Sequence, residues 1–341
     1  MTNPPSSAPN GSLDPSLHPS LAAGPARPVE LPAALLTPGI ATLDVALPHG
    51  ITLSCRASGP APGGQAATGV PRVLFLHGFP EAAFAWDEVL LRLAPQVSGI
   101  APNLRGFERS SAPREVSAYR PRHLVADIEA LIAALGGPLD LLVAHDWGGA
   151  VAWNLAALRP ELMRRLLILN SPHPATFLRE LRASSEQQQA SAYMNFLCRP
   201  DAEALLAEND FARLWPFFEN MGGRAWLGEA MRARYRAVWS MGLTGGLNYY
   251  RASPLRPARA ADDALHTLEL PDALATVRVP TTVLWGEQDH ALRPGLLEGL
   301  ERWVPQLQLV RVPEASHWIV HEQPGLVEQH VQQALGLRVG R

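Results

Sequence analysis

Asp146 occupies a position from which a carboxylate could act as a nucleophile. It lies in the segment 144–149, AHDWGG, directly after an apolar run. Small residues two positions before and after a reactive side chain, between a strand and a helix, are typical of a nucleophile elbow, because they permit a sharp turn. A carboxylate there can displace a leaving group from a saturated carbon and form an alkyl ester. The alternative is that Asp146 only caps the helix that follows.

An alkyl ester on Asp146 must be hydrolysed, which requires a base, an orienting acid and an oxyanion hole. Asp289 follows the seventh predicted strand and is the expected acid, with Glu287 as the alternative. His317 follows the last predicted strand and is the expected base. The order along the chain is therefore nucleophile, acid and histidine.

Two backbone N–H groups are expected to form the oxyanion hole. One belongs to Phe79, in the loop 77–80 (HGFP) after the third predicted strand, and the other to Trp147, which follows the nucleophile. The same donors, together with a helix N-terminus, favour the ionised form of Asp146. The alternative is that residues 77–80 form an ordinary turn.

Three other histidines compete for the role of base. The side chain of His145 should point into the scaffold, because it directly precedes the nucleophile. His77 is expected to tie neighbouring loops together, and His173 is expected to be structural at the start of the helical insertion. These expectations leave His317 as the favoured base.

The elements that must position these groups alternate between strand and helix. Strands are predicted over residues 41–47, 51–56, 72–76, 99–104, 139–143, 165–169, 281–285 and 307–312. Helices are predicted over residues 84–93, 122–135, 148–158, 294–303 and 324–335. This order predicts an α/β fold with a mostly parallel eight-stranded sheet flanked by helices. The reactive groups then lie at the carboxyl ends of the strands.

The chain divides into three parts by composition and pattern. Residues 1–40, rich in Pro, Ser, Ala and Gly, predict a disordered leader rather than a signal peptide. Residues 41–173 and 272–341 are expected to form the α/β core. Residues 174–271 are mostly helical in pattern and rich in aromatic residues, which indicates a helical lid over the site.

Composition excludes several classes of function. The 341 residues are 47% hydrophobic, carry a net charge of −3, and include no lysine. A lysine Schiff base and a Walker-type phosphate loop are therefore excluded, and no basic cluster indicates a nucleic-acid groove. No apolar stretch is long enough to span a membrane. Cys55 and Cys198 lack metal-ligand spacing and fit a reducing, cytoplasmic location, with no metal or cofactor expected.

Five separated segments resemble the epoxide hydrolase branch of the α/β-hydrolase superfamily. They are residues 77–80, 104–107 with 110–113, 145–149, 286–289 and 316–318. The chain order of nucleophile, acid and histidine also matches the superfamily. The resemblance implies an α/β-hydrolase fold with an inserted helical cap. It further implies that the chain converts a small apolar epoxide and water into a vicinal diol, without a cofactor.

Members of that family use two cap tyrosines to hold the epoxide oxygen and to protonate it as the ring opens. The segments 193–200 and 247–251 resemble those that carry them, which assigns Tyr193 and Tyr250. Tyr249 is the alternative for the second position. Some Asp-nucleophile hydrolases carry the acid after the sixth strand, where this chain has Asn170; an amide cannot serve, which favours Asp289.

The runner-up is a dehalogenase that uses the same nucleophile, acid and base. Haloalkane dehalogenases resemble this chain in Trp147 but commonly carry Asn where Phe79 stands, and fluoroacetate dehalogenases resemble it at Phe79 but carry Arg where Trp147 stands. Both departures favour an uncharged epoxide. An alternative of another class is a non-catalytic small-ligand receptor, because a fold alone does not establish activity. The sequence leaves a monomer and a homodimer equally open.

Overall fold

The strands found in the described part of the chain form one eight-stranded sheet. The computed structural model describes residues 31–60, 69–223, 225–258 and 264–337. The strands are β1 (Ala41–Ala46), β2 (Thr52–Ser58), β3 (Arg72–Leu76), β4 (Ser98–Pro102), β5 (Leu141–His145), β6 (Leu166–Leu169), β7 (Thr281–Gly286) and β8 (Leu307–Val312). Their order is β1-β2-β4-β3-β5-β6-β7-β8, with β2 antiparallel to both of its neighbours and all other pairs parallel. The predicted fold class is confirmed.

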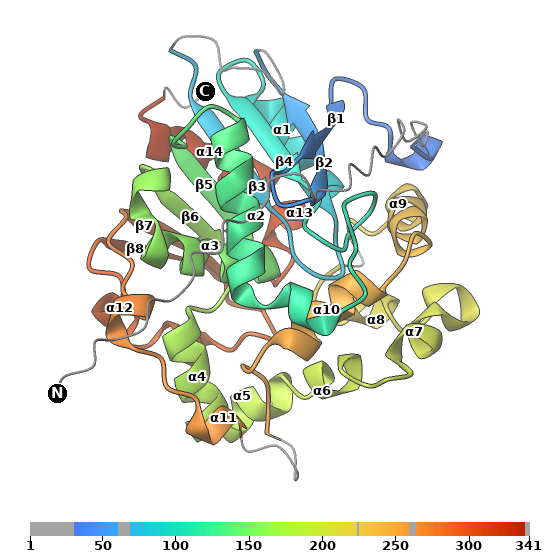
Figure 1. Cartoon of the computed structure of the whole chain (residues 1–341), viewed down its shortest axis with the longest axis vertical. Helices are drawn as coiled ribbons and strands as arrows, with labels where there is room; N and C mark the ends of the chain where they lie inside the picture. The colour runs from blue at the N-terminus through green and yellow to red at the C-terminus, as the bar shows by residue number, and fades with distance from the viewer. Residues whose placement is uncertain (1–30, 61–68, 224, 259–263, 338–341) are drawn as a thin grey trace, which may run out of the picture.

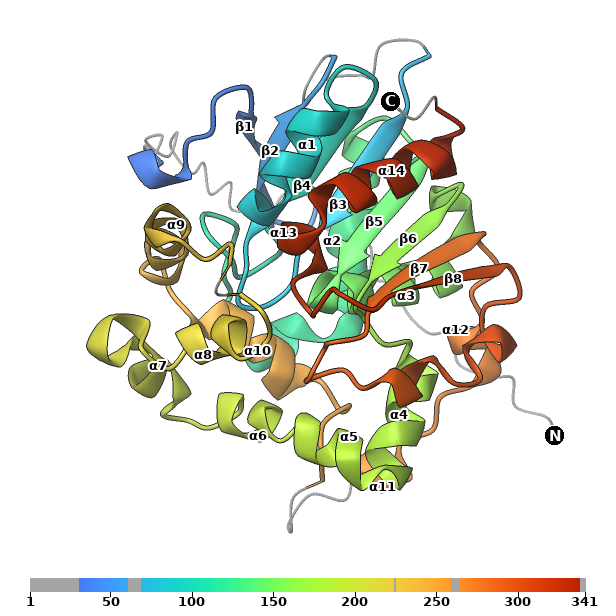
Figure 2. The same cartoon turned by 180° about the vertical axis from the view of Figure 1, so that it is seen from behind.

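Helices cover both faces of the sheet (Figures 1 and 2). One face carries α1 (Asp87–Leu93) and α14 (Pro324–Leu335), and the other carries α2 (Pro121–Ala134) and α3 (Asp146–Leu158). Strand β5 shows why: Leu142 and Ala144 belong to the core on the α2–α3 side, whereas Leu141 and Val143 belong to the core on the α1–α14 side. Alternate side chains of a strand point to opposite faces, so a continuous apolar run is buried on both.

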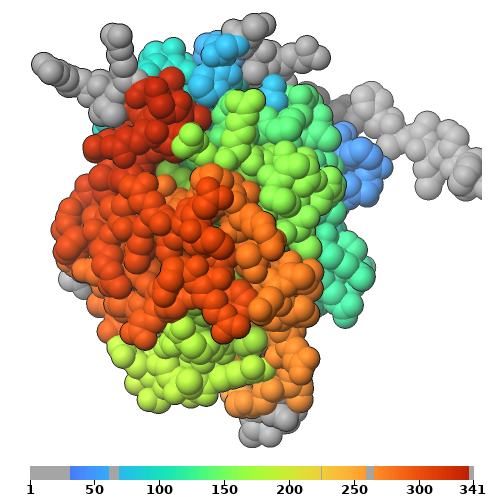
Figure 3. All heavy atoms as spheres, turned by 90° about the vertical axis from the view of Figure 1, so that its left-hand side faces the viewer, coloured from blue at the N-terminus to red at the C-terminus, as the bar shows by residue number. Residues whose placement is uncertain are grey.

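Within the described residues, most of the helices between β6 and β7 lie beyond the carboxyl ends of the parallel strands (Figures 1 and 2). The helices between these two strands are α4 (Pro174–Ala183), α5 (Ser185–Ala190), α6 (Tyr193–Leu197), α7 (Ala202–Phe211), α8 (Trp215–Glu219), α9 (Glu229–Trp239), α10 (Thr244–Ala252), α11 (Ala264–Thr267) and α12 (Asp272–Ala275). We call the described part of residues 174–271 the cap. Figure 3 shows the yellow-green atoms of the cap packed directly against the orange-red atoms of the C-terminal part of the core.

Aromatic side chains join the cap to the core. The ring of Phe218 lies 4.6 Å from that of Tyr235 and 4.4 Å from that of Trp318, measured between ring centroids. Trp318 directly follows the predicted base and also donates a hydrogen bond from its indole to the carbonyl of Phe217, at 3.2 Å. Phe217 and Phe218, two of the aromatic residues that marked the insertion in the sequence, therefore contact the loop after β8.

Two features differ from the sequence-based expectations. Residues 294–303 form two short 3₁₀ helices, Pro294–Leu297 and Leu300–Arg302, instead of one α-helix. They are separated because Gly299 adopts a left-handed φ of +68°. The packed structure also begins before residue 41, since Leu35 is fully buried within the 3₁₀ helix Ala33–Leu35. Residues 1–30 of the predicted leader lie outside the described residues.

Among the helices within the described ranges, none combines the length and the apolar character that crossing a bilayer demands.

Candidate active site

The turn from β5 into α3 presents the side chain of Asp146 at the carboxyl edge of the sheet. Asp146 has a positive φ of +50°, a conformation that non-glycine residues rarely adopt. The turn also brings the backbone close to its neighbours: a Cβ at Gly148 would lie 2.6 Å from backbone atoms of Leu76 and His77. A small residue at this point is therefore required by packing, and the strained residue is the one with a reactive side chain.

One carboxylate oxygen of Asp146 is held by the loop after β3. The backbone N–H of Phe79 donates to Oδ1 of Asp146 at 2.8 Å. Gly78 permits this approach, because a Cβ there would lie 2.2 Å from the same oxygen. The N–H of Trp147 lies in the first turn of α3, where backbone donors have no partner within the helix. Of the two expected oxyanion donors, the N–H of Phe79 therefore contacts the Asp146 carboxylate, and the N–H of Trp147 follows it at the start of α3.

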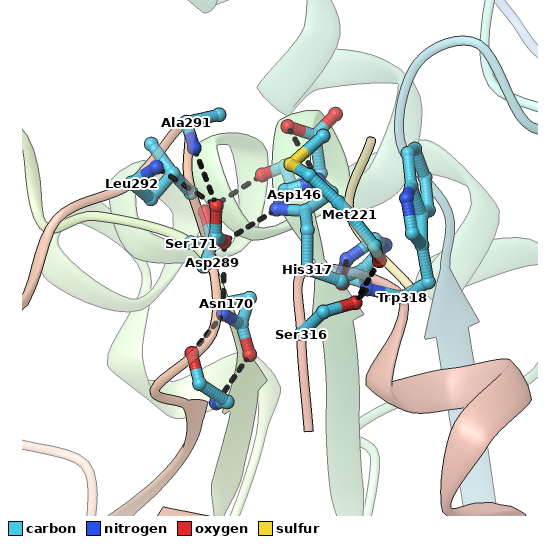
Figure 4. Close-up of polar contacts among 12 residues, drawn as sticks. Asp146, Asn170, Ser171, Met221, Asp289, Ala291, Leu292, Ser316, His317 and Trp318 are labelled. Atoms are coloured by element: carbon cyan, nitrogen blue, oxygen red, sulfur yellow. Dashed lines mark hydrogen bonds and ion pairs between the residues drawn. The ribbon is translucent and has the colours of Figure 1, made fainter. Parts of the chain in front are cut away.

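His317 lies between two carboxylates (Figure 4). Its Nδ1 donates to Oδ2 of Asp289 at 2.7 Å, and its Nε2 lies 3.7 Å from Oδ2 of Asp146. Asp289 is completely buried. Its other oxygen, Oδ1, accepts hydrogen bonds from the N–H groups of Ala291 and Leu292, each at 2.9 Å.

Asn170 holds the acid in place. Its side-chain amide donates to Oδ2 of Asp289 at 2.9 Å, while its own oxygen accepts the N–H of Gly286 at 2.8 Å (Figure 4). The sequence identified Asn170 only as a residue that cannot be the acid. In the structure, Asn170 orients Asp289, the residue expected to be the acid.

The charges around His317 shift its protonation. Burial lowers the pKa of His317, but the adjacent Asp289 carboxylate, together with Asp146 and Glu81, outweighs burial and raises it from 6.5 to about 9. For Asp289, burial raises the pKa, and the charge and hydrogen bond of His317 outweigh it and lower the pKa. In the resting site, an imidazolium therefore lies between two carboxylates.

Tyr193 and Tyr250 face Asp146 from the cap. They lie on α6 and α10, with ring centroids 6.2 Å apart, and each hydroxyl interacts with the other. Burial raises the pKa of both hydroxyls above the ordinary value of 10.0, with the charge of Asp146 as a further cause. Both groups therefore stay protonated and can donate.

Tyr249, the alternative to Tyr250, points elsewhere. Its hydroxyl donates to the carbonyl of Arg105 at 3.0 Å. The start of α10 lies so close to the loop 104–107 that a Cβ on Gly245 would be 2.3 Å from Gly106. This glycine contact fixes α10 against the core, so that Tyr250 lines the cavities over Asp146.

Two cavities meet at Asp146, Tyr193 and Tyr250. The first, of about 260 Å³, also contacts His317, Phe79 and Phe217 and reaches the exposed residues Asn220 and His290. The second, of about 190 Å³, extends beneath α4. Its lining is mostly apolar and includes Phe177, Leu178, Met194, Leu255, Leu268, Leu270 and Leu292. Among the described residues that line the two cavities, Asp146 is the only Asp, Glu or Arg.

Comparison with known proteins agrees with this geometry. Residues 71–324 match the family model of the alpha/beta hydrolase fold. The chain is 34% identical over 294 residues to the AB hydrolase superfamily protein YfhM of Bacillus subtilis (strain 168), which covers 84% of this chain and 95% of that protein. It is 32% identical over 269 residues to epoxide hydrolase 4 of Mus musculus, covering 76% of this chain and 71% of that protein.

The chain belongs to the epoxide hydrolase family of α/β-hydrolase-fold proteins. It is therefore a hydrolase. A solved structure of Bacillus megaterium epoxide hydrolase in complex with an inhibitor superposes with a TM-score of 0.77 at 28% identity, over 86% of this chain and 100% of that one. A structure described as one of the novel epoxide hydrolases from metagenomes of hot environments is 34% identical, with a TM-score of 0.76, over 86% of this chain and 98% of that one.

The other candidate residues of this epoxide hydrolase family member have structural partners. Glu287 pairs with Arg311 at 2.9 Å. His77 accepts the N–H of Leu104, and burial lowers its pKa to about 4. His173 accepts the N–H of Ala175 as the N-cap of α4, and burial likewise lowers its pKa to about 4.

His145 points into the scaffold, as expected from its place before the nucleophile. Sequence reasoning missed its partner there, the buried carboxylate of Glu81. The available signal was position, because Glu81 directly follows the loop 77–80. Throughout the described ranges, no cluster of three or more His, Cys, Asp or Glu residues is arranged to hold a metal ion.

Proposed function

We propose that this hydrolase opens an epoxide to a vicinal diol through a covalent ester on Asp146. The observation that carries the proposal is the convergence of four groups on one point between two apolar cavities. The nucleophile and base come from the sheet, and the two tyrosine hydroxyls come from the cap. The known epoxide hydrolases that resemble the chain support the substrate class.

Ring opening uses the cap and the nucleophile. Tyr193 and Tyr250 donate hydrogen bonds to the epoxide oxygen. Because Oδ1 of Asp146 is engaged by the N–H of Phe79, Oδ2 is the attacking atom. Its electron pair forms a bond to one ring carbon, and the bond between that carbon and the oxygen breaks. The oxygen takes a proton from a tyrosine, which regains one from the imidazolium of His317 or from water.

Ester hydrolysis uses the sheet side alone. Esterification removes the negative charge of Asp146, which is one cause of the raised pKa of His317. The pKa of His317 therefore falls, and a larger fraction of the imidazole is neutral and able to accept a proton. His317 then takes a proton from water, and the water oxygen attacks the Asp146 carbonyl carbon. The N–H groups of Phe79 and Trp147 bind the oxyanion. Its collapse expels the diol oxygen, which receives the proton from His317.

The two cavities indicate an uncharged substrate. A dry cavity of about 150 Å³ lined by apolar side chains is large enough to bind benzene. The cavity of about 190 Å³ can therefore hold a phenyl-sized substituent, and the one of about 260 Å³ provides a route to solvent. Burying a charged substituent without a partner in either cavity is unfavourable.

Trapping the ester tests the proposal. His317→Gln should block hydrolysis more than ester formation, so incubation with styrene oxide should add the mass of one substrate molecule to the peptide that contains Asp146. Asp146→Ala, treated identically, should show no adduct. Wild-type protein assayed with styrene-type and aliphatic epoxides beside haloalkanes separates an epoxide hydrolase from a dehalogenase, and a protein that turns over neither is a receptor. An adduct on another residue removes Asp146 as the nucleophile.

A further inference from the structure

The mechanism above gives no role to Glu81, a buried carboxylate beside the loop that carries His317. Glu81 is 1% exposed and lies directly behind the catalytic histidine loop. Its Oε2 lies 3.2 Å from Nδ1 of His145, and its Oε1 accepts hydrogen bonds from the hydroxyl of Tyr235 at 2.9 Å and from Nε2 of His321 at 2.6 Å. Burial raises the pKa of this carboxyl, but hydrogen bonds from His145 and His321 outweigh it and lower the pKa. Both oxygens of the buried charge are thus engaged.

His145 transmits the position of Glu81 to the base. Its Nε2–H donates to the backbone carbonyl of His317 at 2.8 Å, and the two imidazole rings lie 4.8 Å apart. The acceptor is the carbonyl of the base itself, so a shift of His145 moves the backbone from which the catalytic imidazole projects. Glu81 also lies two residues after Phe79, whose N–H holds Asp146. The Glu81 carboxylate therefore connects the loop 77–80 to the loop that carries His317.

Helix α9 of the cap holds the other side of Glu81. Tyr235, on α9, donates to Glu81, and Trp239, one turn later, donates from its indole to the carbonyl of Pro80 at 2.7 Å. His321, on the short helix α13 (Ile319–Glu322), stacks on Trp226 with centroids 4.0 Å apart and an interplanar angle of 12°. The nitrogen of His321 that contacts Glu81 is also 3.1 Å from the Tyr235 hydroxyl. Two consecutive residues, Pro80 at the end of the loop 77–80 and Glu81 after it, are thus tied to one cap helix.

We propose that Tyr235 and His321 are positioning residues that act through Glu81 and His145 on His317. They hold the base at the distance from the Asp146 ester that water attack requires. The inference rests on the proposed ester mechanism. Formation of the ester uses Asp146 and the cap tyrosines Tyr193 and Tyr250, and the proton that the tyrosine regains can come from water. Loss of this support therefore slows hydrolysis of the ester and leaves its formation intact.

Tyr235→Phe is the first test, because it removes a single oxygen. Because the removed oxygen donates a hydrogen bond to the charged Glu81, decay of the alkyl-enzyme should slow by about tenfold. The decay is followed by rapid quench and intact-mass measurement after a single turnover with styrene oxide. In the steady state, kcat and KM should fall together while kcat/KM stays within about twofold of wild type. The alkylated fraction of the protein should rise accordingly.

Two substitutions of His321 differ in whether they keep a hydrogen-bond donor for Glu81. His321→Gln keeps an N–H donor for Glu81 and should retain most of the hydrolysis rate, whereas His321→Leu removes the donor and should behave like Tyr235→Phe. Tyr119→Phe is the matched control: it deletes another buried hydroxyl, which donates to the carbonyl of Pro113 at 2.9 Å and has no contact with Glu81. It should leave the decay rate, kcat and KM unchanged.

Two different failures can be distinguished. If Tyr235→Phe lowers kcat/KM in proportion to kcat, or if its alkyl-enzyme decays at the wild-type rate, the positioning role is wrong even though the ester exists. If His317→Gln accumulates no adduct on Asp146, the ester mechanism itself is wrong. Equal rates for His321→Gln and His321→Leu also contradict the proposal, because only one of them retains the donor.

Discussion

The two sides of the site are fixed by different physical means. On the sheet side, Asp146, Asp289 and His317 follow strand ends and are held by hydrogen bonds from Phe79, Asn170 and the backbone. On the cap side, Tyr193 and Tyr250 are held mainly by ring contacts with Phe217, Phe79 and Trp147. Directional bonds fix the groups that we propose make and break the ester, whereas aromatic packing fixes the hydroxyls that we propose protonate the epoxide oxygen.

This difference separates the residues that we propose carry out the reaction from those that shape the substrate cavities. Polar networks tolerate few changes, because an unpaired buried polar group costs free energy. Packed aromatic surfaces tolerate exchanges of similar volume. Substitutions in the cap can therefore change which substrate binds while the sheet side keeps the same reaction. We expect substitutions in the cap to slow ester formation and substitutions on the sheet side to slow ester hydrolysis.

The largest expected effect comes from removing both cap hydroxyls. Tyr193→Phe combined with Tyr250→Phe should slow ester formation by roughly a thousandfold, because general-acid assistance contributes about 10²–10⁴-fold. Each single variant should retain part of the rate, since the second hydroxyl still donates. Single-turnover accumulation of the Asp146 adduct measures the step, with Tyr249→Phe as the neighbouring variant that removes a hydroxyl outside the cavities. Ester formation at the wild-type rate in the double variant would contradict the assignment of both tyrosines.

The next largest effect is on the free energy of unfolding, and it tests the residues of the sheet side alone. The pKa of His317 is raised from 6.5 to about 9, so the folded state binds its proton more tightly than the unfolded state does. This stabilisation is complete below about pH 6.5 and is lost as the pH rises through about 9; it amounts to about 3 kcal/mol. Urea unfolding of wild type should show this decline relative to His317→Gln. Parallel curves for the two proteins would mean that no such shift exists.

The smallest effect concerns the orientation of the acid. Asn170 has a positive φ of +35°, so glycine is the replacement that adds no backbone strain. Asn170→Gly should slow ester hydrolysis by about tenfold, because Asp289 loses one donor while keeping the N–H groups of Ala291 and Leu292. Asn209→Gly, at an exposed cap residue with φ +51°, controls for the added chain entropy. If both variants hydrolyse the ester equally fast, the Asn170 hydrogen bond has no part in orienting the acid.

Much of the sheet side was predictable because its signals are local. A small residue at Gly148 and a strand-to-helix pattern identify the elbow, and parallel strands bring their carboxyl ends to one edge, which predicts that Asp289 and His317 lie near Asp146. The same reasoning failed at 294–303, where one left-handed glycine, Gly299, divides a pattern that otherwise predicts a helix. The burial of Leu35 was missed because no pattern in the neighbouring residues indicates which part of the core it packs against.

The amino-acid sequence by itself determined the carboxylate at the elbow, the chain order of the candidate site residues and the α/β architecture, since residue type, spacing and periodicity are properties of short segments. Tertiary structure decided which of two adjacent tyrosines faces Asp146, because the close approach of Gly245 to Gly106 sets the rotation of α10. It also joined Glu81, His145, Tyr235 and His321 behind the base. These four residues come from distant parts of the chain, and a buried charge finds its partners only when the chain packs.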